Sequence, residues 1–210
     1  MELSELENLF SLQRLEGYAT LHDHENNFAL IAAISHKIGI LEVIIRNKID
    51  FLLSQRDKNW WQHLPAEIHI VGDVAHTNTL VSKQSLGFWI KVVEHFKIHN
   101  QIFSLDFLHC IDFKRYCHKN KNRFNNTKDL RNYQKATIIL RLLHTLRNRA
   151  FHFENLYKYT PKGYPRLNTK IGKNNQELYI ALQPDRIPVF LNDLLESFHP
   201  ELVRYADKTH

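Results

Sequence analysis

The residues whose types and spacing could do chemistry stand together near position 150. Arg147 and Asn148 are followed, after three further residues, by His152. An arginine is a permanent cation whose planar fork of N–H donors suits phosphate oxygens. A histidine titrates near neutral pH and can take a proton from an oxygen or return one. These types suffice for RNA transesterification, in which one group removes the 2′-hydroxyl proton and another stabilises charge on phosphorus.

Helix geometry decides how these side chains can be arranged. At about 100° per residue, Arg147 and His152 stand at the two edges of an arc of roughly 140°. Asn148 and His144 fall within the same arc, which makes His144 a candidate supporting residue. One copy would make a loose site, whereas two copies across a twofold axis would place two arginines and two histidines around one cleft. A structural role is the alternative, because cations near a helix end complement its dipole.

Hydrophobic periodicity predicts the helices that must position this motif. A helix over residues 128–151 carries the motif at its C-terminal end, and a longer helix of about six turns precedes it. On the longer helix, Glu42 and Arg46 have the spacing of an i,i+4 ion pair. The expected buried residues are Leu130, Ala136, Ile139, Leu140, Leu143, Leu146 and Ala150 on the motif helix and Leu30, Ile34, Ile38, Leu41, Ile45, Ile49 and Leu52 on the longer one.

The rest of the chain predicts shorter helices and elaborated loops. Helices are expected over residues 3–15, 79–99, 105–116 and 184–198. Gly87 falls inside the second of these, which indicates close packing or a kink. Residues 166–182 are compatible with one small β-hairpin. We therefore expect an all-α helical bundle in a single domain over residues 1–210, with a core at about 28–155 and a C-terminal helical extension at about 184–205.

Composition excludes several classes of protein. Six glycines and six prolines among 210 residues are too few for an all-β sandwich or barrel. Two cysteines, Cys110 and Cys117, exclude a disulfide-stapled scaffold and predict a cytoplasmic location. The acidic N-terminus is unlike a signal peptide. Residues 38–53, the most hydrophobic stretch, carry four charged side chains, so no membrane span and no membrane partner are expected.

The net charge of +6 permits nucleic acid as a partner. Basic residues flank the motif helix on both sides in sequence. The candidate RNA-binding residues are Lys119, Lys121, Arg123 and Arg131 before the motif and Lys158 and Arg166 after it. Tyrosines are interleaved with the second set, and phosphate attraction with aromatic stacking is typical of sequence-tolerant single-strand binding. Solvated loops are the alternative interpretation.

Fourteen histidines raise the question of a metal site. The pairs His22/His24 and His95/His99 lack further ligands of suitable spacing. Cys110 and Cys117, each beside a histidine, have the right types for zinc, but six residues separate them instead of two to four. We therefore expect no metal ion and no cofactor.

Three segments in order resemble one known family. Residues 146–152 (LRNRAFH) resemble the Arg-Asn-x3-His signature of HEPN-fold ribonucleases. Residues 41–49 (LEVIIRNKI) are similar to the helix that bears an Arg-Asn pair in the abortive-infection (Abi) branch of that family. Residues 85–89 (SLGFW) resemble its central Gly-aromatic segment. The resemblance covers about residues 28–155.

The resemblance implies a HEPN-like helical bundle that dimerises to form a composite, metal-independent endoribonuclease site. Arg147 would contact the scissile phosphate, His152 would act as acid/base and Asn148 would position its neighbours. Arg46 and Asn47 would support the cleft. Products would carry a 2′,3′-cyclic phosphate and a 5′-hydroxyl. The family resemblance also implies an antiphage or toxin role, with RNA as substrate, a homodimer as the working form and an antitoxin of protein or RNA.

Two other interpretations remain open at this point. In the first, the chain is a non-catalytic HEPN module in which Arg147 and His152 bind RNA or a partner without cutting. In the second, the chain is a protein-interaction scaffold that neither binds nor cuts RNA. Substitution of His152 distinguishes an enzyme from both.

Overall fold

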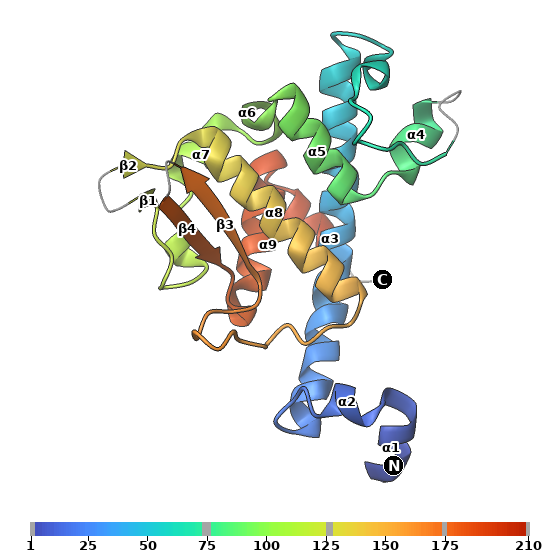
Figure 1. The fold of residues 1–210 in the computed structure, drawn as a ribbon, viewed down its shortest axis with the longest axis vertical. Helices are drawn as coiled ribbons and strands as arrows, with labels where there is room; N and C mark the ends of the chain where they lie inside the picture. Colours follow the sequence, from blue (N-terminus) through green and yellow to red (C-terminus); the bar gives the residue numbers. More distant parts are fainter. Residues whose placement is uncertain (1–2, 73–76, 125–127, 174–175, 209–210) are drawn as a thin grey trace.

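The computed structural model describes residues 3–72, 77–124, 128–173 and 176–208. These residues are mainly helical, which confirms the predicted class (Figure 1). The helices are α1 (Leu3–Phe10), α2 (Leu12–Leu15), α3 (Leu21–Ser54), α4 (Thr77–Lys83), α5 (Leu86–Phe96), α6 (His99–Ile102), α7 (Leu105–Cys110), α8 (Asn132–Phe151), α9 (Ile187–Phe198) and α10 (Leu202–Ala206). The strands are β1 (Arg123–Phe124), β2 (Lys128–Asp129), β3 (Asn168–Lys173) and β4 (Gln176–Ala181), and 3₁₀ turns lie at Trp60–His63, Phe113–Arg115 and Pro184–Arg186.

Helix α3 is the central element of the fold. It begins at a capping box, in which the Thr20 side chain accepts from the Asp23 backbone N–H and the Asp23 carboxylate accepts from the Thr20 N–H. Helices α5, α8 and α9 pack along it. Its buried stripe follows the predicted period, although Ile31 and Leu53 are buried where Leu30 and Leu52 were expected. Burial of this stripe places the motif helix against α3.

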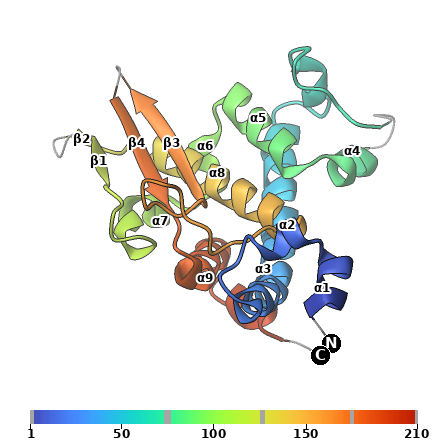
Figure 2. The ribbon, with the colours of Figure 1, turned by 60° about the horizontal axis from the view of Figure 1, so that its bottom comes forward.

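Helix α8 is buried on the predicted face. All seven expected residues, from Leu130 to Ala150, are nearly inaccessible to solvent. The helix lies between α3 on one side and the β3–β4 hairpin on the other (Figures 1 and 2). It begins at Asn132 and not at residue 128, because residues 128–129 pair with residues 123–124 as a short ladder that the periodicity did not predict.

The β3–β4 hairpin confirms the strand pair expected near residues 166–182. The strands are antiparallel, with Asn168 opposite Ala181 and Ile171 opposite Leu178. The side chains of Ile171, Leu178 and Ile180 are buried, and Tyr179 between the last two is exposed. This alternation of period two lets one face of the hairpin cover α8 while the other meets solvent.

Two predicted helices are each broken in two, and the helix expected over residues 105–116 ends at Cys110, with a separate 3₁₀ turn at Phe113–Arg115. The helix expected over residues 3–15 stops at Ser11, which adopts a left-handed backbone with φ of 64°. The helix expected over residues 79–99 is interrupted by Gln84 and Ser85. The buried Gln84 amide exchanges two hydrogen bonds with the backbone of Val71, and Ser85 caps α5. Neither the positive φ at Ser11 nor the Gln84 and Ser85 contacts change the hydrophobic periodicity. The periodicity therefore could not predict either interruption.

Helix α3 is long and apolar enough to meet a membrane-span criterion. No segment of this kind was expected from the sequence. Its most apolar window of 18 residues has a mean hydropathy of 2.0, and 33% of that window is buried in the fold. The prediction weighed residues 38–53, whereas the less charged stretch begins earlier along the helix. A helix that forms the centre of a packed core meets the same test.

Candidate functional site

The predicted motif lies at the exposed C-terminal end of α8 (Figure 1). Arg147 and Asn148 occupy the last turns of the helix and are partly buried. His152 is the C-cap residue, and its backbone N–H donates to the Asn148 carbonyl at 3.0 Å. Its imidazole is exposed and has no hydrogen-bond partner among the residues that the structure describes. The ring is therefore available to exchange protons with a ligand.

Arg147 is held in place from α3. Its Nε donates to Glu42 Oε2 at 3.0 Å, and the two side chains are 32% and 16% exposed. One terminal nitrogen donates to Asn148 Oδ1 at 3.4 Å. The guanidinium lies 5.2 Å from the Phe151 ring centroid. Because a guanidinium has five N–H donors, three are left without an acceptor in the described part of the chain.

The i,i+4 spacing had suggested that Glu42 pairs with Arg46. In the structure Glu42 pairs with Arg147 instead. The contact between helices forms in place of the contact within α3 because α8 crosses α3 at this turn. The Arg46 Nε is buried without a hydrogen-bond partner in the described residues, and Asn47 is exposed. Within the described ranges, no hydrogen bond joins Arg46 or Asn47 to the motif. Glu42 is therefore the α3 residue that reaches the site.

His144 and Asn148 form a second contact within the site. The Asn148 amide and His144 Nε2 are 3.1 Å apart, one helical turn from each other. Burial lowers the pKa of His144, and the charge of Arg147 lowers it further, whereas Glu42 opposes the shift. The neutral ring then accepts at Nε2 and keeps its proton on Nδ1. His144 acts as a fixed support for Asn148.

Gly87 makes room for this histidine. A Cβ at position 87 would lie 3.0 Å from His144 Nε2 and 3.3 Å from Cε1, which is tighter than ordinary contact. The close packing expected at Gly87 is confirmed, although the residue stands in the first turn of α5 and not within a longer helix. A pocket of about 520 Å³ opens beside it, with Ser85, Arg141 and His144 in its lining.

The chain that follows His152 is anchored to the start of α3 (Figure 2). Phe153 adopts a left-handed backbone with φ of 52° and stacks on Phe28 at 5.1 Å. The fully buried Asn27 donates to the Glu154 carbonyl at 3.1 Å and accepts from the Leu156 N–H at 2.9 Å. These contacts fix the backbone on the far side of the histidine, so the C-cap position is held from both directions.

The predicted basic residues separate into two regions. Arg131 is the N-cap of α8, so about 24 Å of helix divides it from Arg147. Lys121 and Arg123 lie with it at that end, where Arg123 pairs with Asp129. Lys119 donates to the Gly163 carbonyl at 2.8 Å and thereby joins the other region.

Lys158 and Arg166 lie beside each other after the motif, since the Arg166 N–H donates to the Lys158 carbonyl at 2.9 Å. The Arg166 charge lowers the pKa of Arg149, as does burial, which has the larger effect. Arg166 is therefore near the last turn of α8. The second basic set adjoins the motif and most of the first set does not.

The candidate metal ligands do not converge. His24 is packed among aromatic rings, and His95 Nε2 contacts the His63 carbonyl at 3.1 Å. Cys110 is exposed, whereas Cys117 is buried. In the described ranges, no three side chains of His, Cys, Asp or Glu gather as metal ligands would.

Three residues of the site were missed from the sequence. Glu42 was assigned to the wrong arginine, and Phe151 and Asn27 were given no role. A signal existed for Phe151, because it follows Arg147 by one helical turn. Nothing local marks the role of Asn27 beside the motif, because its partners there, Glu154 and Leu156, are more than a hundred residues away in sequence.

Comparison of the chain with protein-family models, with curated proteins and with solved structures found no match. The protein is mainly helical, with an arginine, an asparagine and two histidines gathered on the last turns of one helix and its C-cap.

Proposed function

We propose that this protein is a metal-independent endoribonuclease with a HEPN-like helical bundle. The observation that carries the proposal is the pair of side chains at the end of α8 that keep groups available for a ligand, Arg147 and His152. Arg147 keeps three free N–H donors after it binds Glu42 and Asn148, and the His152 imidazole is exposed without a partner in the described residues. A phosphate-binding cation and a proton-transfer group are the two functions that cleavage by a 2′-hydroxyl requires.

The roles follow from the contacts. Arg147 binds a non-bridging oxygen of the scissile phosphate and stabilises the charge that develops there. His152 takes the proton from the 2′-hydroxyl or gives one to the departing 5′-oxygen. Asn148, held by His144, orients the guanidinium. The 2′-oxygen forms the new bond to phosphorus, so the products carry a 2′,3′-cyclic phosphate and a 5′-hydroxyl.

We further propose that two copies form the site together. Arg147 and His152 stand at the two edges of the exposed arc, so a twofold axis beside α8 would supply each group from both copies. Exposed apolar side chains accompany the motif, since Phe151 and Phe153 flank His152 in the sequence and are each 42% exposed. Apolar side chains of this kind would be covered in a dimer. The toxin or antiphage role and a neutralising antitoxin belong to the same proposal and rest on the family resemblance.

The test is cleavage of end-labelled single-stranded RNA by the purified protein in excess EDTA. The parent should cut and leave 2′,3′-cyclic phosphate ends. His152→Ala should cut about 10²–10⁴-fold more slowly, since it lacks the proton-transfer group. The fold should survive, because the side chain is exposed and the C-cap contact uses the backbone.

Two results would contradict the proposal. Cleavage by His152→Ala at the parent rate would remove the histidine from the mechanism. Binding of RNA by the parent without any cleavage would favour the non-catalytic module, in which Arg147 and His152 hold RNA and do not cut it.

A further inference from the structure

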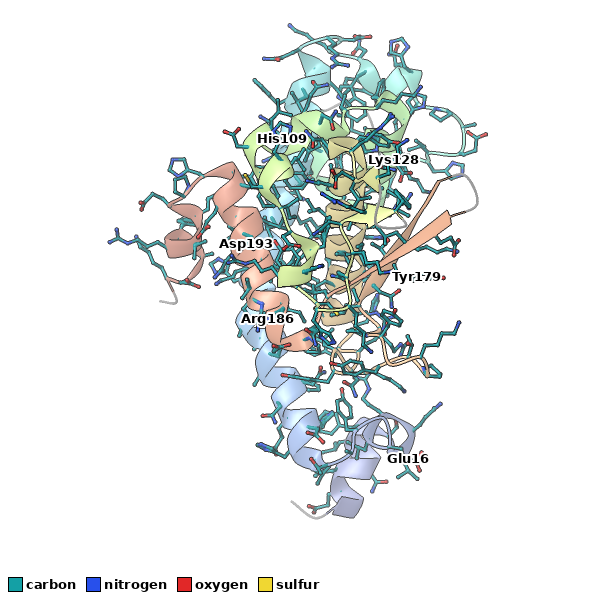
Figure 3. The ribbon with its side chains drawn as sticks, turned by 90° about the vertical axis from the view of Figure 1, so that its left-hand side faces the viewer. Glu16, His109, Lys128, Tyr179, Arg186 and Asp193 are labelled. Carbon is teal, nitrogen blue, oxygen red and sulfur yellow. The ribbon has the colours of Figure 1, made fainter. Side chains whose placement is uncertain are left out.

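A separate pocket of about 350 Å³ lies between the outer face of the hairpin and the turn that precedes it. Its lining consists of Thr160, Pro161, Lys162, Tyr164, Asn168 and Tyr179. Figure 3 shows Tyr179 on the hairpin, and this side chain is 48% exposed. The strand alternation explains its position, because the neighbouring Leu178 and Ile180 point into the core. The pocket therefore presents aromatic surface to solvent.

The turn on the other side of the pocket is held rigidly. The Thr160 N–H donates to the Tyr164 carbonyl at 2.7 Å, and the Gly163 N–H donates to the Thr160 carbonyl at 2.8 Å. Gly163 has φ of 70°, a conformation that glycine adopts without strain. Lys119 reaches across from another segment, with its Nζ 2.8 Å from the Gly163 carbonyl oxygen and 5.2 Å from the Tyr164 ring centroid. The pocket is thus preformed.

Two polar groups of the pocket keep hydrogen-bonding capacity that a ligand could use. The Asn168 amide nitrogen donates to the Pro165 carbonyl at 2.7 Å, which fixes the amide and leaves its oxygen as an acceptor. Lys162 is exposed and has no partner in the described part of the chain. The pocket thus combines two aromatic rings, an amide oxygen and one lysine ammonium group. A nucleobase that carries a phosphate uses each of these, through stacking, a hydrogen bond and charge.

We propose that this pocket binds one unpaired nucleotide of an RNA strand, with the base against Tyr164 and Tyr179 and the phosphate near Lys162. The proposal rests on the proposed function in one respect, namely that the strand is the one cut at Arg147 and His152. Thr160 is eight positions after His152, a span of at most about 28 Å, so one strand can reach both places.

The test measures RNA affinity in the His152→Ala background, where RNA stays intact. The probe is a fluorescein-labelled oligoadenylate of about ten nucleotides in EDTA, followed by anisotropy. Tyr164→Leu and Tyr179→Leu should each weaken binding about tenfold, because leucine keeps apolar bulk but cannot stack. Tyr164→Phe and Tyr179→Phe should retain the affinity. The matched control is Tyr205→Leu on α10, an exposed tyrosine outside the pocket, which should change nothing.

A second arm uses AMP in place of the oligomer. AMP should compete only at far higher concentration than the unlabelled oligomer, and equal potency would contradict the assignment to a strand. Unchanged affinity for the oligomer in both leucine variants would overturn the proposal that this pocket binds RNA, even if the parent cleaves RNA. A parent that binds RNA through the tyrosines but never cleaves it would overturn the nuclease and leave the pocket standing.

Discussion

The two ends of α8 both carry cationic side chains, but the fold engages them differently. At the N-terminal end, Lys135 donates to the Leu108 carbonyl at 2.7 Å and Arg123 pairs with Asp129. At the C-terminal end, Arg147 donates once to Glu42 and once to Asn148, which leaves three N–H donors without an acceptor in the described residues. A basic stretch in a sequence is therefore not yet a binding surface. What matters is which donors remain after folding, and at the C-terminal end the remaining Arg147 donors share the end of α8 with the exposed His152.

The largest expected effect comes from breaking the anchor behind the C-terminal end. Asn27→Ala removes the partners of the Glu154 carbonyl and the Leu156 N–H, and the Leu156 N–H would stay buried. The free energy of unfolding should fall by about 2–4 kcal/mol, as measured by urea denaturation. Asn47→Ala, an exposed position on the same helix, is the control and should change it by less than about 0.5 kcal/mol. Equal effects would show that the anchor stabilises nothing.

Two glycines offer a matched pair near the same site. Gly87→Ala forces a methyl group against His144, and the clash should exceed the gain in helix propensity. Gly39→Ala points into open space on α3 and should stabilise by about 0.5–1 kcal/mol. Thermal unfolding should separate the two variants by about 2 kcal/mol. A stabilising Gly87→Ala would mean that His144 moves freely, and the support that we assign to it would be lost.

The ion pairs at the two ends should differ in their contribution to stability. Glu42→Gln weakens a partly buried pair and should cost about 1 kcal/mol, with a further loss of RNA cleavage because Arg147 is no longer held. Asp129→Asn weakens the exposed pair with Arg123 and should cost less than about 0.5 kcal/mol. Chemical denaturation and the cleavage rate give both numbers. A larger loss of cleavage rate in Asp129→Asn than in Glu42→Gln would contradict the assignment of the site to the C-terminal end of α8.

The smallest effect is a dependence of stability on pH. Burial lowers the pKa of His144 below its usual value near 6.5, so the unfolded chain binds more protons than the folded chain between these two pKa values. Stability should therefore fall as pH decreases below about 6.5, whereas above it both states are neutral at this residue. His144→Gln should reduce that slope in denaturation series at several pH values. His24 and His99, whose pKa values burial also lowers, account for a remaining slope.

Periodicity was sufficient for the long elements and insufficient for their ends. The buried face of α8 from Leu130 to Ala150 was predicted correctly, because a core helix must repeat apolar residues at steps of three and four. The break at Ser11 was not predicted, because a single residue with positive φ leaves that pattern unchanged. Local sequence determines propensity, whereas backbone reversals depend on distant packing.

The site shows the same division. The motif residues were selected from their types, their spacing and the family resemblance, and helix geometry predicted that they share one face. The partner of Arg147 could not, because two arginines lay within reach of Glu42 and only the crossing of α3 and α8 decides between them. The separation of Arg131 from the motif likewise follows from the length of α8, which sequence proximity conceals.

The central claim is that the C-terminal end of α8 performs the cleavage. The most direct measurement compares single-turnover cleavage of one RNA, in excess EDTA, by Arg147→Ala and Arg131→Ala, arginines at the two ends of the same helix. The account predicts a loss of about 10²–10³-fold for Arg147→Ala and a rate within about twofold of the parent for Arg131→Ala. Equal losses in the two variants, or an equal absence of loss, would contradict it.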